Sequence, residues 1–132
     1  MKIKKRTIRT TLMATATLFV AACQQMPIEH DNESNFTRVT VDTIPLFYGK
    51  KISLEGNHIV LAEDGTFDGT WRSEPIAGKW EMRDGYWCRV LTVFFQADRL
   101  NQEDCQLWES SEGKLRGTRS KGKGQSFVYS VE

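Results

Sequence analysis

Chemistry-bearing residues are scarce in this sequence of 132 residues, which contains only two histidines, three prolines and three cysteines. His30 and His58 lie far apart, and no His/Cys/Asp cluster has the spacing of a zinc site. The chain also lacks a Gly-x-Ser-x-Gly motif, a P-loop and a dinucleotide-binding fingerprint. Asp64 and Asp84 could form a carboxylate pair, but each is explained by a turn. We therefore expect no catalytic residues, no metal and no cofactor, and interpret the protein as a non-enzyme.

Long apolar runs are also missing. The apolar segment 12–22 has eleven residues, whereas a helix that spans a bilayer needs roughly twenty. The nine residues at the start of the chain include five basic side chains and no acidic one. A basic segment, a short apolar segment and small residues before a cleavage point are typical of a secretory signal peptide. We therefore expect residues 1–22 to be removed.

The sequence "VAAC" at 20–23, which includes the end of this leader and the residue after it, resembles the lipobox of bacterial lipoproteins. The resemblance implies that Cys23 carries diacylglycerol, becomes the mature N-terminus and is N-acylated. Gln24, in place of an aspartate, then favours the outer membrane. The alternative is an ordinary signal peptide cut after an alanine, with Cys23 incidental. We expect a protein anchored by lipid on the periplasmic side of the cell envelope, with residues 23–42 as a polar tether.

The other two cysteines form an even pair once Cys23 is lipidated. Cys88 and Cys105 are separated by sixteen residues, and a disulfide around such a loop contributes about 3 kcal/mol in the chain-entropy model. We expect them to be bonded across neighbouring antiparallel strands, with Cα atoms within about 7 Å. Two free buried thiols are the alternative.

From residue 50 onward, turn signals separate short strand-like runs. Asp64-Gly65 and Asp84-Gly85 are favoured in tight hairpins, where both central residues take positive φ. Apolar and polar residues alternate along 66–71, 80–83 and 126–131, which indicates strands with one buried face. We predict an all-β domain over 43–132, an antiparallel meander of about eight strands that forms a small lipocalin-like barrel or half-barrel. A short helical turn is expected around 40–48.

The alternation also predicts which bulky side chains point inward. An eight-stranded barrel is only wide enough for side chains or one small ligand, so we expect a largely filled core with at most a shallow pocket near Trp87 or Trp108. Function would then depend on the outer surface and loops. The side chains predicted to point inward are Phe67, Trp71, Trp80, Met82, Phe127 and Tyr129.

The sequence is similar to a family of small secreted bacterial proteins of unknown function. The similarity lies in four segments, at 49–71, 76–90, 104–108 and 114–129. The shared features are an early Gly-Lys strand, two Asp-Gly hairpins, two cysteines and a Gly-rich final turn. The sequence departs from that pattern at Lys51, where threonine is common, and lacks a tryptophan close behind Cys88. The resemblance implies a β-barrel-like fold with a cysteine pair, and it implies no activity.

Charge is unevenly distributed along the chain. Without the five basic leader residues, 13 basic side chains face 17 acidic ones, a net charge of −4. Such an acidic body gives no reason to expect nucleic acid. The basic run 114–123 is either a solvated hairpin or a patch for anionic headgroups or an acidic partner. The tryptophans form either core or a ligand pocket. The candidate surface for a ligand or partner comprises Trp87, Trp108, Lys114, Arg116 and Arg119.

These features favour a lipid-anchored periplasmic binding or interaction module. Its partner would be an envelope protein or a small apolar ligand, in addition to the membrane that holds the lipid. Two alternatives remain open: an inhibitor of a lysozyme or protease that uses loops at the barrel end, and an accessory of envelope assembly.

Mass spectrometry of the membrane fraction tests the anchor. We expect the mature N-terminus in that fraction to be an acylated Cys23. A wild-type mature chain that is soluble and starts at another residue would contradict the lipoprotein interpretation.

Overall fold

The computed structural model describes residues 35–132, and the predictions for the signal peptide, Cys23 and most of the tether lie outside these residues. No helix among the described residues has the length and hydropathy to span a membrane. The strands are β1 (Thr37–Arg38), β2 (Lys51–Leu54), β3 (Asn57–Leu61), β4 (Thr66–Trp71), β5 (Glu74–Arg83), β6 (Tyr86–Val93), β7 (Glu103–Ser111), β8 (Lys114–Thr118) and β9 (Ser126–Val131). The short helical segments are η2 (Ile44–Phe47), η3 (Ala97–Arg99) and α1 (Arg119–Gly122).

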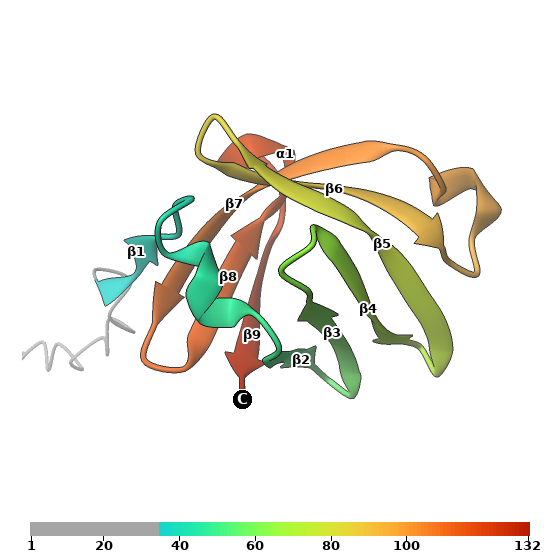
Figure 1. The fold of residues 1–132 in the computed structure, drawn as a ribbon, viewed down its shortest axis with the longest axis horizontal. Helices are drawn as coiled ribbons and strands as arrows, with labels where there is room; N and C mark the ends of the chain where they lie inside the picture. The colour runs from blue at the N-terminus through green and yellow to red at the C-terminus, as the bar shows by residue number, and fades with distance from the viewer. Residues whose placement is uncertain (1–34) are drawn as a thin grey trace, which may run out of the picture. The chain divides into compact units, whose positions relative to one another are not determined.

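Strands β2 to β9 form a closed antiparallel barrel (Figure 1). Successive strands pair in chain order, β2 pairs with β9 and thereby closes the ring, and β1 is added at the side of β7. The predicted all-β meander of about eight strands is therefore confirmed. The folded part reaches further toward the N-terminus than residue 43, because Thr37 pairs with Ser110 and Val39 is buried.

Only one of the two Asp-Gly turns has the backbone conformation that the sequence predicts. Asp84 and Gly85 both have positive φ (54° and 80°), as expected for a two-residue hairpin. At the other pair only Gly65 has positive φ. There the Asp64 carboxylate accepts hydrogen bonds from the backbone N–H and the hydroxyl of Thr66, at 3.0 and 2.6 Å. This side-chain turn takes the place of the left-handed aspartate that the pattern predicted.

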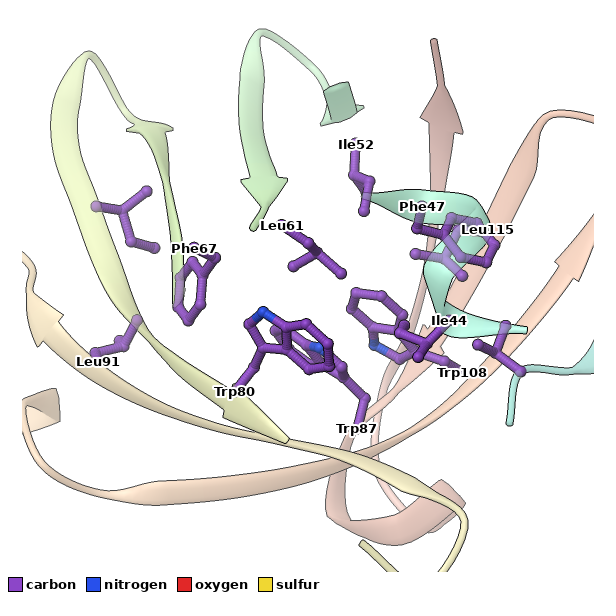
Figure 2. Close-up of a cluster of buried hydrophobic side chains, with 12 residues drawn as sticks. Ile44, Phe47, Ile52, Leu61, Phe67, Trp80, Trp87, Leu91, Trp108 and Leu115 are labelled. Atoms are coloured by element: carbon purple, nitrogen blue, oxygen red, sulfur yellow. The ribbon is translucent and has the colours of Figure 1, made fainter. Parts of the chain in front are cut away.

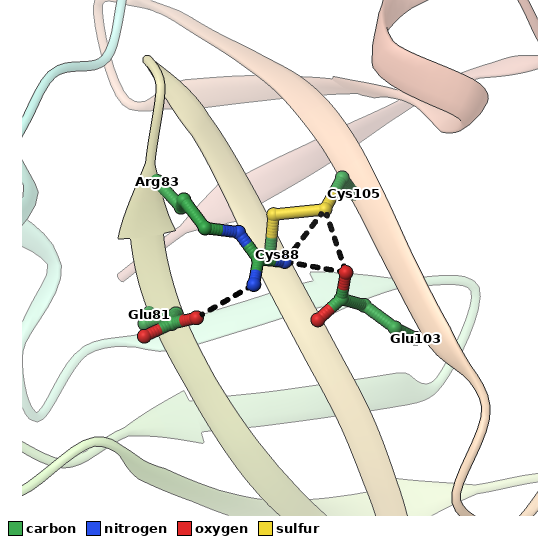
Figure 3. A network of polar contacts seen from close by, with 5 residues as sticks. All are labelled: Glu81, Arg83, Cys88, Glu103 and Cys105. Atoms are coloured by element: carbon green, nitrogen blue, oxygen red, sulfur yellow. Dashed lines mark hydrogen bonds and ion pairs between the residues drawn. A yellow bond between two sulfur atoms is a disulfide. The ribbon is translucent and has the colours of Figure 1, made fainter.

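The disulfide lies on the outer side of β6 and β7. Cys88 and Cys105 are directly opposed in the antiparallel register, with Cα atoms 3.9 Å apart, which confirms the predicted pair. Arg83 crosses the bond (Figure 3): its guanidinium donates to Cys105 Sγ at 3.5 Å and forms ion pairs with Glu103 and, at 3.1 Å, with Glu81. The arginine therefore shields one side of the disulfide.

A cluster of buried hydrophobic side chains forms the core of the barrel (Figure 2). One end is covered by η2, a 3₁₀ helix that confirms the helical turn expected around 40–48 and has Pro45 in its first turn. Phe47 from η2 packs edge-on against Trp108, with ring centroids 6.5 Å apart. The buried core residues are Val39, Ile44, Phe47, Ile52, Leu61, Phe67, Ile76, Trp80, Trp87, Leu91, Trp108 and Leu115.

Strand alternation identified most of the inward side chains correctly. Phe67 and Trp80 belong to the buried core, and Trp71, Met82 and Tyr129 are partly buried against it. Phe127 shares the less exposed face of β9 with Tyr129, but it is only half-buried and is not packed against this core, and the Arg119 guanidinium lies 5.4 Å from its ring centroid. A basic side chain from the neighbouring turn therefore covers this ring.

The ion pair beside the disulfide predicts a pH effect. The hydrogen bond from Arg83 lowers the pKa of Glu103 below its ordinary value of 4.5, and burial opposes this only partly. A carboxyl whose folded pKa is depressed contributes stability above its unfolded pKa and loses that contribution as pH falls through the folded pKa. We expect Arg83→Gln (R83Q) to raise the pKa of Glu103 toward 4.5, as measured by carbon-13 NMR titration.

Arg72→Gln (R72Q) is the control for this titration, because Arg72 is exposed and lies over the ring of Phe95. A Glu103 pKa that is the same in R83Q and in the wild type would contradict the assigned cause.

Candidate functional site

A cavity of about 80 Å³ remains inside the barrel. The segment before β2 contains η2 and covers one end of the barrel, and its Tyr48 forms a β-bridge with Leu61, the last residue of β3. Trp71, which lines the cavity, is the last residue of β4. Because β3 and β4 are antiparallel, these two residues mark opposite ends of the barrel. The cavity therefore lies toward the end that is left uncovered by η2, where the β4–β5 turn, the β6–β7 connection and α1 meet.

The apolar wall of the cavity is built around two stacked indoles. Trp87 on β6 and Trp108 on β7 have ring centroids 4.1 Å apart and planes inclined by 21°, and Phe67 lies 5.9 Å from Trp87. Both tryptophans are buried, and both line the cavity as the sequence predicted for a shallow pocket. The remaining apolar lining residues are Ile52, Ile59, Trp71, Ile76, Leu91 and Phe94.

A chain of polar side chains crosses the same wall. The Trp108 indole N–H donates to Gln106 Oε1 at 3.2 Å, and Gln106 Nε2 donates to Asp104 Oδ2 at 2.7 Å. Asp104 Oδ2 in turn lies 3.7 Å from Arg89 Nη2. These three residues of β7 are two positions apart, so the pleat of the strand turns them all toward the interior.

Arg89 is the most unusual of these groups, because its side chain is only 15% exposed. It follows Trp87 by two positions on β6 and therefore shares its inward face. Burial lowers the pKa of Arg89, and the Asp104 carboxylate partly offsets this effect. Tyr129, another lining residue, has its pKa raised by burial, while the charges of Arg119 and Arg89 act in the opposite direction. The phenol is therefore a neutral hydrogen-bond donor at neutral pH.

Two further arginines complete the lining. Arg99 ends η3 in the β6–β7 connection and is exposed, while Arg119 begins α1 and is half-buried. Within residues 35–132 neither guanidinium has a carboxylate at ion-pair distance. With Asp104 paired to Arg89, the site carries an excess of two positive charges.

One buried donor at this site is unsatisfied. The Nε1–H of Trp87 has no hydrogen-bond partner among the described residues, although Trp87 is only 1% exposed. By contrast, the Trp80 indole donates to the Thr66 carbonyl at 2.9 Å. Buried N–H groups in folded proteins are nearly always paired, so this orphan donor is a rare feature in a residue that lines the cavity.

The basic residues of the predicted surface are not gathered on one face. Lys114 is exposed at the start of β8, and Arg116 lies on the outer face, where it pairs with Glu109 at 3.1 Å and stacks over Phe36. Of the three, only Arg119 reaches the cavity with Trp87 and Trp108. The candidate site therefore combines one predicted basic residue with the two predicted tryptophans.

Sequence reasoning missed three polar residues of the site, Arg89, Arg99 and Gln106. Strand alternation could have found two of them, since Arg89 lies between Trp87 and Leu91 on one face and Gln106 lies two residues before Trp108. Arg99 belongs to a connection with no periodic pattern, so its position is set by the fold of that connection alone.

A group of potential metal ligands lies elsewhere on the barrel. Sulfur atoms of Cys88 and Cys105 and a carboxylate oxygen of Glu103 lie within 4.8 Å of one another. Both sulfurs are joined in the disulfide and have no thiolate to offer. The cluster is therefore explained by the disulfide and by the Arg83–Glu103 ion pair.

Comparison of the chain with protein-family models, with curated proteins and with solved structures returned no match. The resemblance to small secreted bacterial proteins stays a prediction from the sequence.

The polar chain predicts a stability cost at Gln106. Gln106→Leu (Q106L) keeps the size of the side chain but removes the acceptor of the Trp108 N–H and the donor to Asp104. We expect the free energy of unfolding to fall by about 1–3 kcal/mol, measured by urea denaturation.

Gln102→Leu (Q102L) is the matched control, because Gln102 is exposed and donates only to a local carbonyl. Its expected effect is within about 0.5 kcal/mol. Equal losses in the two variants would show that the buried chain contributes nothing specific.

Proposed function

We propose that this protein is a lipid-anchored binding module on the periplasmic side of the cell envelope, and that its barrel takes a small ligand into the cavity. The observation that carries this proposal is the lining itself. Tryptophans and arginines meet at a cavity inside a barrel that also holds a hydrophobic core. Ligand sites are typically concave and mostly apolar, with a few convergent polar groups.

The size of the cavity limits the ligand. At about 80 Å³, it is well below the roughly 300 Å³ at which drug-sized pockets begin. A ligand, or the part of it that enters, is therefore about as large as one six-membered ring. The described lining has neither a serine, cysteine or histidine nor a carboxylate, which favours binding over catalysis.

The proposed anchor and the disulfide are consistent with one compartment. A lipid on Cys23 would hold the barrel at a membrane, and a disulfide such as Cys88–Cys105 persists in an oxidising space such as the bacterial periplasm. A module held there would meet ligands on the periplasmic side of the membrane.

An inhibitor of a lysozyme or protease is the second candidate. It is favoured by apolar side chains exposed at the end of β6 and just after it, where Val93 is 47% and Phe95 is 43% exposed. Such side chains could fill a cleft of a partner enzyme. Inhibition assays of lysozyme and proteases with the purified protein separate this candidate from the ligand-binding module.

Indole N–H resonances test the proposed site directly. We expect small compounds with one apolar ring, such as benzamide and benzoate, to shift the Nε1–H signals of Trp71, Trp87 and Trp108 in a saturable way in ¹⁵N-correlated NMR spectra. The Trp80 signal should hardly move, because Trp80 does not line the cavity and its N–H is already bonded.

Ile59→Phe (I59F) should fill the cavity and reduce these shifts, because Ile59 is a half-buried lining residue. Val128→Phe (V128F), on the exposed face of β9, should leave them unchanged. Shifts that are uniform over all four indoles, or equal in the two variants, would contradict binding at this site.

A further inference from the structure

The charged groups that line the cavity restrict the chemical class of the ligand more than the volume of the cavity does. Three guanidinium groups line it, those of Arg89, Arg99 and Arg119. Only Arg89 has a carboxylate partner within the described residues, Asp104 at 3.7 Å. An arginine stays protonated at neutral pH, so Arg99 and Arg119 add positive charge to the lining that no ion pair with a carboxylate of residues 35–132 offsets.

Asp104, the ion-pair partner of Arg89, also interacts with Gln106. Asp104 Oδ2 accepts a hydrogen bond from Gln106 at 2.7 Å, shorter than its 3.7 Å separation from the guanidinium. The contact with Arg89 is long for a hydrogen-bonded pair, which typically has a separation of about 2.7–2.9 Å. The guanidinium therefore keeps N–H donors that Asp104 does not satisfy, although its side chain is mostly removed from water.

A neutral donor is found at the same place. Tyr129 supplies a phenol among the lining residues. It can donate a hydrogen bond to an oxygen atom, whereas Gln106 already uses its Oε1 to accept from Trp108. The polar part of the cavity is thus dominated by donors and by positive charge.

The rest of the lining is apolar. It comprises Ile59, Ile76 and Leu91 together with the aromatic rings. A ligand that satisfies both kinds of lining group has oxygen acceptors with negative charge at one end and a hydrocarbon body of about one ring at the other. A bare inorganic anion would leave the apolar wall unfilled, and a neutral hydrocarbon would leave the guanidinium groups uncompensated.

We propose that the cavity binds a small organic carboxylate whose apolar body is about the size of one ring, with the carboxylate beside the arginines. This inference rests on the proposed function, that the cavity is a ligand site. Arg99 and Arg119 lie at the accessible side of the cavity and attract the anion. Arg89 holds its oxygen atoms inside.

Calorimetric titration with three probes separates the contribution of the ligand's charge to affinity from that of its apolar ring. Benzoate combines both features, benzamide keeps the ring and replaces the charge with a neutral amide, and acetate keeps the charge without the ring. We expect benzoate to bind about tenfold more tightly than either of the others, the factor that corresponds to one charge-assisted hydrogen bond.

A double variant then tests the arginines. Arg99→Gln with Arg119→Gln (R99Q/R119Q) should weaken benzoate binding about tenfold and leave benzamide binding unchanged. Arg89 is kept in this variant, because its loss would leave Asp104 buried without its cation. The matched control, Arg72→Gln with Lys79→Gln, removes two charges from exposed positions outside the lining and should leave both affinities unchanged.

The outcomes distinguish the two levels of the proposal. Equal affinity for benzoate and benzamide, both with the indole shifts described above, would overturn the carboxylate and leave the ligand site standing. Acetate that binds as tightly as benzoate would overturn the apolar body. No binding of any probe, in a wild-type protein whose NMR spectrum is that of a folded barrel, would overturn both the carboxylate and the ligand site.

Discussion

The stack of Trp87 on Trp108 is the contact on which both the core and the cavity depend. The two indoles come from neighbouring strands, lie 4.1 Å apart and occupy the interior of the barrel. Phe47 from the covering segment packs against one of them, and Phe67 packs against the other. Such aromatic pairs contribute about 0.5–1.5 kcal/mol beyond the area they bury. The face of the stack that these neighbours leave uncovered becomes a wall of the cavity.

The polar groups beside this stack cost stability that a purely structural core would avoid. A buried guanidinium needs a partner, and Arg89 finds only a distant carboxylate that also accepts from Gln106. Replacing such a group with an apolar side chain of similar size is often neutral or stabilising. The inward polar groups are what supports the proposal of a ligand, whereas the Arg83 ion pairs lie outside, beside the disulfide.

The fold was more predictable from the sequence than the site. Strand alternation and turn residues carry local information, so the antiparallel meander, the Cys88–Cys105 register and most inward aromatics were predicted correctly. Asp64 was misjudged because its side chain forms the turn in place of a left-handed backbone. The site depends on closure of the barrel, which brings Arg99 from an irregular connection and Arg119 from a turn onto one cavity. No local sequence pattern predicts that Arg99 and Arg119 line the same cavity.

The most direct test of this account is a set of intermolecular NOE measurements between benzoate and the protein. We predict contacts from the ring protons to the side chains of Ile59, Leu91 and Trp87, which line the cavity on different strands. We predict none to Val128 on the outer face. Contacts only to exposed side chains such as Phe95 and Val93, with none to the cavity lining, would contradict a ligand site inside the barrel.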